Sequence, residues 1–309
     1  MHRPRRVSWL PWLAAAALAL SMWLPAGCQR EVAPPPAAKG DNTRPAQAVL
    51  LLTRHLHDND LEAFARHAVP PGLHERLKVA WREGRTRWPL EELPFDERLP
   101  TLLAALAADG SEARLQQVFD RQLSGAHAEI KAAATALGLF GVQYVQHDAD
   151  FSAAEREHYG QFIAAISQWA AQAPLGDPQH ARKAIPRLAR AARATRLASE
   201  GDFAKAGMGK SLRRLGGFVA AGKAVLAGYG LDLDGSLLGL RATLQSQTGD
   251  TARVRMQYTL GGQPVDVFVD LQRRKGRWYL SEYLRRAEAA VALPAPAPPP
   301  PAATGGAPG

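Results

Sequence analysis

The hydrophobic positions of this chain follow two different periods, one after the other. Over residues 44–230, apolar side chains recur at the three- and four-residue spacing of amphipathic helices, whereas over residues 231–288 they alternate with polar ones. Alternation is typical of strands that bury one face. The sequence therefore predicts an α+β fold, in which a mostly helical region is followed by a four-stranded antiparallel meander packed on helices.

Caps and breakers divide the helical region. Asp60 is placed to cap a helix, and Pro70-Pro71-Gly72 interrupts the chain soon afterwards. Ser152 and Glu155 predict a capping box, in which each side chain accepts a hydrogen bond from the backbone amide of the other residue. Residues 126–146 are alanine-rich and apolar, and we expect them to form a central buried helix.

The alternation is clearest in two runs of apolar residues separated by polar ones. These are Val254, Met256, Tyr258 and Leu260, followed by Val265, Val267, Val269 and Leu271. Glycine-containing turns at 248–250, 261–262 and 275–276 separate the expected strands, because glycine adopts the positive φ that tight hairpins require. One face of the meander is apolar and needs helices to cover it.

The N-terminus differs from both regions. A basic start is followed by the apolar stretch 7–24, which is interrupted by Pro11 and is too short to favour a membrane span. Small residues then lead to Cys28 in the run Leu24-Pro25-Ala26-Gly27-Cys28. This combination resembles the signal peptide of a bacterial lipoprotein. The resemblance implies that residues 1–27 are removed and that the Cys28 thiol is acylated with diacylglycerol. Secretion with cleavage nearby and an uncleaved anchor are the alternatives.

Lipidation of Cys28 implies a place in the cell envelope. In enterobacterial lipoproteins a residue other than Asp after the cysteine, here Gln29, implies an outer-membrane lipoprotein that faces the periplasm, with the inner membrane as the alternative. Residues 28–43 are proline-rich and predict a semi-extended, lipidated tether. Residues 289–309 are rich in Pro, Ala and Gly and predict a disordered tail. A single cysteine excludes an internal disulfide.

The charge balance favours anionic partners. Lysine and arginine number 38 against 29 aspartates and glutamates, which gives a formal net charge of +9. Lipid headgroups, lipopolysaccharide phosphates and acidic glycans are partners of the matching sign. One basic amphipathic helix, residues 182–196, has a small apolar side that favours a solvated surface over a membrane-bound one. Nucleic acid is not an expected partner, because export separates the protein from it.

Two segments imitate catalytic motifs. Residues 204–211 fit a permissive phosphate-binding loop, but no strand precedes them, and we expect a turn between helices. Residues 231–237 resemble the nucleophile loop of haloacid-dehalogenase-type phosphatases, which needs a parallel sheet and later metal-binding acids.

The histidines do not form a metal-binding pattern. His55 and His57 diverge on a helix, and His74-Glu75 lacks a second histidine at ligand spacing. No metal, cofactor or catalytic residue is therefore predicted.

The end of the expected sheet carries a second resemblance. Residues 269–280 contain Lys275-Gly276-Arg277-Trp278-Tyr279, which is similar to the closing hairpin of NTF2-like domains in bacterial lipoproteins. That resemblance implies a cone that holds a small ligand or mediates association. The sequence as a whole favours a lipid-anchored, non-catalytic binding or scaffold module that contacts the membrane through its N-terminus and binds an anionic envelope component or a protein partner. An envelope hydrolase with a site assembled from scattered residues is the alternative.

Overall fold

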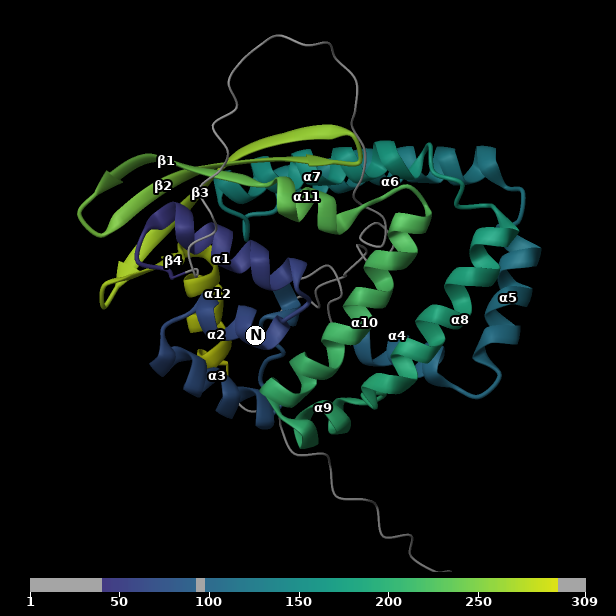
Figure 1. The fold of residues 1–309 in the computed structure, drawn as a ribbon, viewed down its shortest axis with the longest axis horizontal. Coiled ribbons are helices and arrows are strands. Elements are labelled where there is room, and N and C mark those ends of the chain that lie inside the picture. Colours follow the sequence, from purple (N-terminus) through teal and green to yellow (C-terminus); the bar gives the residue numbers. More distant parts are fainter. Residues whose placement is uncertain (1–40, 93–97, 294–309) are drawn as a thin grey trace, which may run out of the picture.

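The computed structural model describes residues 41–92 and 98–293 (Figure 1). The predicted signal peptide, Cys28 and the predicted tether up to residue 40 lie outside the described residues, as does the predicted tail from residue 294. Within the described ranges the fold is α+β, which confirms the expectation drawn from the two hydrophobic periods.

Helices form most of the described chain up to residue 239, and the sheet follows. The helices are α1 (Pro45–His57), α2 (Leu61–Ala68), α3 (Pro71–Arg82), the 3-10 helix η1 (Leu90–Glu92), α4 (Leu99–Ala107), α5 (Ser111–Gln122), α6 (His127–His147), α7 (Ala153–Ala170), α8 (Pro178–Thr195), α9 (Glu200–Ala206), α10 (Met208–Gly228), α11 (Leu233–Gly239) and α12 (Ser281–Ala292). The strands are β1 (Arg241–Thr248), β2 (Thr251–Leu260), β3 (Gln263–Arg274) and β4 (Arg277–Leu280).

The strands form one antiparallel sheet in the order β1-β2-β3-β4, which confirms the predicted meander. Val254 of β2 lies opposite Val269 of β3, so that the alternating apolar positions of neighbouring strands share a face. Gly249, Gly261 and Gly276 adopt positive φ in the turns, as the hairpin geometry requires.

Helices that precede the sheet in the sequence cover it. α1 packs on β1 and α7 packs on β3, where Ile166 and Trp169 join the buried strand residues in one hydrophobic cluster. α7 also bonds directly to the backbone of β3. The Gln161 side-chain amide donates to the Asp266 carbonyl oxygen at 3.1 Å and accepts from the Asp266 backbone amide at 2.9 Å. A side chain thus takes the place of a neighbouring strand where the short β4 does not reach.

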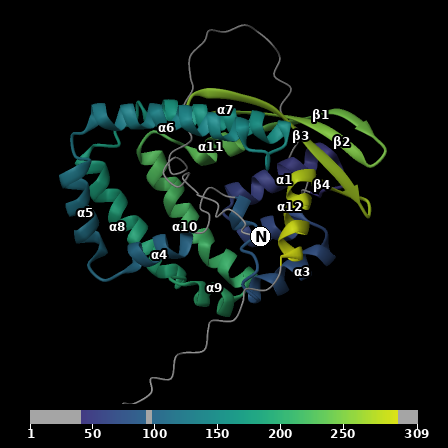
Figure 2. The same ribbon diagram turned by 180° about the vertical axis from the view of Figure 1, so that it is seen from behind.

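A larger hydrophobic cluster lies among the helices. It includes the fully buried aromatic residues Trp81, Trp88, Phe64 and Phe203. α8 lies between α5 and α10 (Figure 2), and it buries alanines while its arginines face outward, as expected for a solvated helix. Within the described ranges, none of the helices has the length and hydropathy that a membrane span requires.

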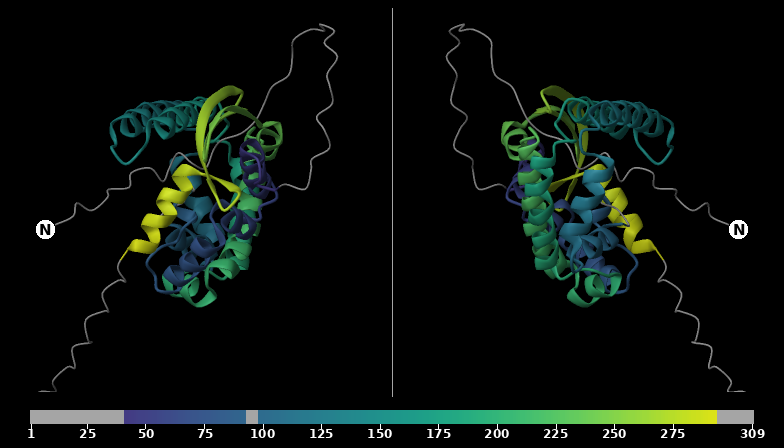
Figure 3. Two further views of the ribbon diagram at one scale, coloured as in Figure 1. Left: turned by 90° about the vertical axis from the view of Figure 1, so that its left-hand side faces the viewer. Right: turned by 90° about the vertical axis from the view of Figure 1, so that its right-hand side faces the viewer.

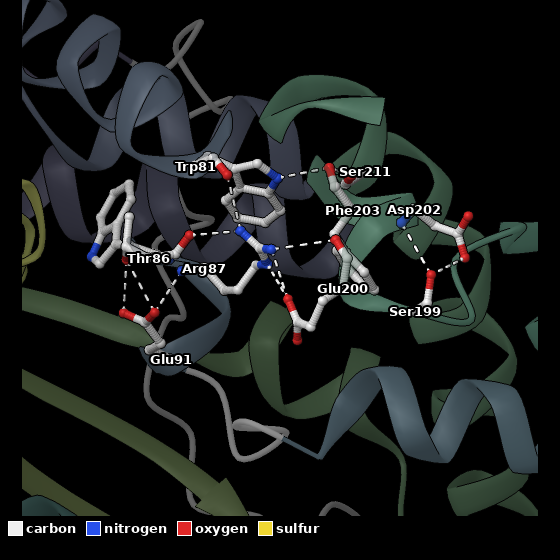
Figure 4. Close-up of polar contacts among 10 residues, drawn as sticks. Trp81, Thr86, Arg87, Glu91, Ser199, Glu200, Asp202, Phe203 and Ser211 are labelled. Carbon is white, nitrogen blue, oxygen red and sulfur yellow. Dashed lines mark hydrogen bonds and ion pairs between the residues drawn. The ribbon is translucent and has the colours of Figure 1, made fainter. Parts of the chain in front are cut away.

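Arg87 joins two parts of this helical core (Figure 4). Its guanidinium carbon lies 5.2 Å from the centre of the Trp81 ring and 5.9 Å from that of Phe203. The guanidinium donates to the backbone carbonyl oxygens of Trp81 and Thr86, and to the carboxylate and carbonyl of Glu200. All five guanidinium N–H groups therefore have acceptors. The bonds to Glu200 link the segment after α3 to the start of α9.

One helix departs from the sequence prediction. Residues 126–146 were expected to form a central buried helix, but α6 lies at the outside of the fold against α7 (Figure 3). Leu139 is 68% exposed and Phe140 is 56% exposed. The buried face of α6 is formed mostly by small residues, and a Cβ added to Gly138 would overlap the side chain of Ser167. Small residues bring the two helices together and leave the larger apolar side chains at the surface, a division that composition alone does not reveal.

Two predicted boundaries shift by a few residues. Asn42 falls inside the predicted tether, residues 28–43, but it is only 4% exposed. Its carbonyl oxygen accepts a hydrogen bond from the backbone amide of Trp278 in β4 at 2.7 Å. At the other end, α12 continues to Ala292, inside the stretch 289–309 expected to be a tail. Packing therefore begins before the expected helical region and ends beyond the expected sheet region.

Candidate anion-binding pocket

A pocket of about 410 Å³ lies where α2, α3 and β4 meet the first described residues. Nine of its 12 lining residues are polar or charged. The lining residues are Asn42, Glu62, Arg66, His67, Val69, Pro71, His74, Glu75, Lys78, Gly209, Arg277 and Tyr279. Segments from both ends of the described chain therefore build one site.

Helical spacing brings the side chains of α2 and α3 to the pocket. Glu62 and Arg66 are four residues apart on α2, and His74 and Lys78 are four residues apart on α3, so each pair shares a helix face. The Asp60 carboxylate caps the start of α2, as predicted from the sequence. The cap and the proline break after α2 fix where both helices begin, and hence which faces meet at the pocket.

The alternation of side chains along β4 places every second residue of that strand at the pocket. Arg277 and Tyr279 are two residues apart on β4 and both line the pocket. Trp278, between them, belongs instead to the hydrophobic cluster of the sheet. The hydrogen bond between the Trp278 amide and the Asn42 carbonyl holds the start of the described chain against this strand. The nearby charge of Arg277 also contributes to lowering the pKa of Asp41, after the larger effect of hydrogen bonds from Thr43.

The acidic residues of the pocket already have basic partners. Glu62 Oε2 lies 2.5 Å from Arg213 Nη1 of α10, and Glu75 Oε2 lies 2.8 Å from Lys78 Nζ. Arg66 and Arg277 make no ion pair within the part of the chain that the structure describes. The pocket therefore presents two uncompensated guanidinium groups, which favour an anionic ligand.

Two histidines between these charges are held in the neutral form. Burial, followed by the nearby charges of His55, Arg66 and Arg277, lowers the pKa of His67. Burial also lowers the pKa of His74, against the opposing effect of Glu75. His67 Nδ1 lies 2.8 Å from His55 Nε2, so one of these two rings donates a proton and the other accepts it. A bound anion would favour the protonated form of either pocket histidine.

A second group of titratable residues lies in the interior between η1, α7 and α12. Arg286 Nη1 lies 3.1 Å from Glu92 Oε2, and Nη2 of the same guanidinium contacts Glu155. Burial raises the pKa of Glu92 to about 7, although the charge of Arg286 acts in the opposite direction. Glu155 also completes the predicted capping box with Ser152, and both hydrogen bonds of that box are present. Each of the three charged groups has an ionic partner, and the cluster joins three helices.

The motif-like segments have structural roles in the described chain. Residues 204–211 form the turn from α9 to α10, with Gly207 at a φ of 75°, as expected. The Asp232 carboxylate accepts a hydrogen bond from the Gly235 amide and caps the short helix α11. Asp234 has a partner that the sequence did not indicate, because its carboxylate lies 2.6 Å from the ammonium of buried Lys223.

The predicted functional residue and the observed pocket are separate features. Cys28, the one position to which the sequence assigns a chemical role, lies outside the described residues. His55 contacts His67, and His67 and His74 line the same pocket, but no group of three or more His, Cys, Asp or Glu residues in the described ranges could hold a metal ion. The sequence does not single out the pocket arginines, Arg66 and Arg277, because each is one of many arginines. The only prior signal was the basic excess of the whole chain.

Comparison with protein-family models, with curated proteins and with solved structures finds no match to this chain.

Proposed function

We propose that this chain is a lipid-anchored protein of the cell envelope, attached through Cys28 to the outer membrane and facing the periplasm, with the inner membrane as the alternative. Its folded domain is a binding module for an anionic envelope component and does not catalyse a reaction. The proposal is supported by the N-terminal sequence pattern and the basic net charge. One structural observation carries it: Arg66 and Arg277 line the same pocket and have no acidic partner among the described residues.

The ion pairs of the pocket make the hydrolytic alternative less suitable. A hydrolase needs a nucleophile or a base that can activate water. In this pocket the Glu75 carboxylate is bound to Lys78, and the Glu62 carboxylate is bound to Arg213. Both pocket carboxylates are thus engaged by cations. The neutral imidazoles of His67 and His74 remain as candidate bases, but the lining residues include no serine, threonine or cysteine to act as a nucleophile.

Binding to a soluble polyanion tests the pocket. The protein from residue 28 with Cys28→Ser is titrated with heparin and followed by calorimetry. Arg66→Gln/Arg277→Gln should weaken binding by at least tenfold, because each lost charge-assisted hydrogen bond is worth about 1.5–3 kcal/mol. Arg54→Gln/Arg76→Gln is the matched control, since it removes the same charge from exposed positions outside the pocket. Equal weakening by both pairs would show that only overall charge matters, and would contradict the proposed site.

The anchor is tested independently of the pocket. The full chain expressed in a Gram-negative host should incorporate labelled palmitate and fractionate with membranes. Cys28→Ser should abolish both, because the thiol is the acyl acceptor. Persistent labelling and membrane association of Cys28→Ser would contradict lipidation at this residue.

A further inference from the structure

The number and placement of cations in the pocket distinguish between kinds of anion. Arg66 comes from α2 and Arg277 from β4, and the charges of both act on His67. One guanidinium is sufficient to bind both oxygens of a carboxylate. Two guanidiniums from different elements that line one pocket instead suit a group with three or more oxygens in a tetrahedral arrangement, such as phosphate. A bound phosphate would favour protonation of His67 and His74, and each protonated ring has two N–H groups, of which one is available beyond the contact with His55 or Glu75.

The remainder of the pocket suits the uncharged or cationic part of a small ester. Its volume of about 410 Å³ is at the lower end for small-molecule sites, and is larger than a phosphate group alone requires. Glu75 is 67% exposed at its side chain, and Lys78 is 45% exposed. These two residues can accept from and donate to hydroxyl or amino groups that project from a bound phosphate ester.

The pocket lies next to the point where the described part of the chain begins. Asn42 lines the pocket and is hydrogen-bonded to β4, so the described part of the chain begins beside the pocket. If Cys28 is acylated, residues 28 to 41 span at most about 50 Å at roughly 3.3–3.6 Å per residue. The point of attachment, and the pocket with it, is then held near the bilayer. A short tether of this kind raises the effective concentration of lipid headgroups at the pocket to the order of millimolar.

We infer that the pocket binds the phosphate group of a lipid headgroup in the membrane to which the chain is anchored. The inference rests on the proposed function, an anion-binding pocket in a lipidated protein, and it narrows the anion to a phosphate ester and its source to a membrane lipid. Arg66 and Arg277 hold the phosphate, and His67 and His74 contribute further donors. Binding would keep the domain close to the membrane surface in addition to the acyl chain.

Vesicle binding tests the inference with phosphate as the variable. The protein from residue 28 with Cys28→Ser is sedimented with vesicles of an uncharged galactolipid, doped either with phosphatidic acid or with enough oleate to give the same surface charge. Binding to the phosphatidic acid vesicles should exceed binding to the oleate vesicles by at least tenfold. Arg66→Gln/Arg277→Gln should lose this preference, whereas Arg54→Gln/Arg76→Gln should keep it, with all variants melting at similar temperatures.

The possible failures separate the inference from the proposed function. Equal binding to oleate and phosphatidic acid vesicles, with loss in Arg66→Gln/Arg277→Gln, would overturn the phosphate assignment and leave the anion pocket. Binding that is insensitive to these two arginines would overturn both. A third arm uses soluble glycerol 3-phosphate. If this ester binds while the phosphatidic acid vesicles do not, a free phosphate ester is the ligand and the lipid assignment is overturned.

Discussion

Two adjacent glycines of α10 should respond in opposite ways to the same substitution. A Cβ added to Gly216 would lie less than 3.0 Å from the backbone carbonyl oxygen of Asn59, whereas a Cβ added to Gly217 would meet no atom within 4 Å. Asn59 cannot move easily, because it occupies the turn between α1 and α2 with a φ of 58°. The turn is also fixed by a hydrogen bond from the Asp60 amide to the His55 carbonyl at 2.9 Å.

The magnitudes follow from two opposing effects. Replacing glycine with alanine inside a helix favours folding by about 1 kcal/mol at either position. At Gly216, overpacking against a backbone atom costs about 1–3 kcal/mol or more, and the short approach places the cost at the upper end. We expect Gly216→Ala to lower the free energy of unfolding by about 2 kcal/mol. Gly217→Ala should raise it by about 0.5–1 kcal/mol.

Urea unfolding followed by circular dichroism measures both variants on the same protein background. Their composition is identical, so the difference of about 3 kcal/mol reports the position alone. Because 1 kcal/mol corresponds to roughly 2–4 °C in a domain of this size, the melting temperatures should also separate clearly. A Gly216→Ala protein as stable as Gly217→Ala would refute the close approach of α10 to the turn after α1.

Four further substitutions test other contacts. Lys223→Met should lower the free energy of unfolding by about 3 kcal/mol, because the ammonium donates to the carbonyls of Leu56 and His57 as well as to Asp234, and the buried carbonyls would lose their partner. Asp234→Asn keeps those two bonds and should cost less than half as much in the same urea titration. Arg87→Lys should cost about 2 kcal/mol, since an ammonium has three donors where the guanidinium uses five, and unchanged stability would contradict the fastening of α9. Glu92→Gln should flatten the pH dependence of stability. Because folding raises the pKa of Glu92 from 4.5 to about 7, its contribution is present below pH 4.5 and is lost as the pH rises to 7, by at most about 3 kcal/mol. A wild-type stability that does not fall over this window, measured by urea titration, would contradict the effect.

The sheet could be predicted from the sequence because its signal is local. Alternation between Arg253 and Leu260 identifies a half-buried strand, and the glycine turns fix the pairing of neighbouring strands. Caps such as Asp60 and Ser152 are equally local, since donor and acceptor lie within one turn. The element types therefore depend on short stretches of sequence that can be interpreted without knowing the rest of the fold.

The surroundings of α6 and the pocket could not be predicted in this way. α6 is apolar on most sides, so periodicity does not indicate which face meets α7. Arg66 and Arg277 lie near opposite ends of the described chain, and only the packing of α2 beside β4 brings both to one pocket. Lys223 gave no signal because two of its acceptors are carbonyls at the end of α1, and backbone atoms have no sequence signature.

The hydrogen bond between Asn42 and Trp278 has a mechanical consequence. Tension applied to the chain before Asp41 would reach the domain first at this bond, and would therefore act on β4. β4 is the shortest strand, with 4 residues, and it also carries Arg277 and Tyr279 of the pocket. If the chain is anchored to a membrane through Cys28 and the pocket binds a ligand, as proposed, a stretched tether would pull on the pocket wall that β4 provides, and the distance of the domain from the membrane would affect how often the pocket is occupied.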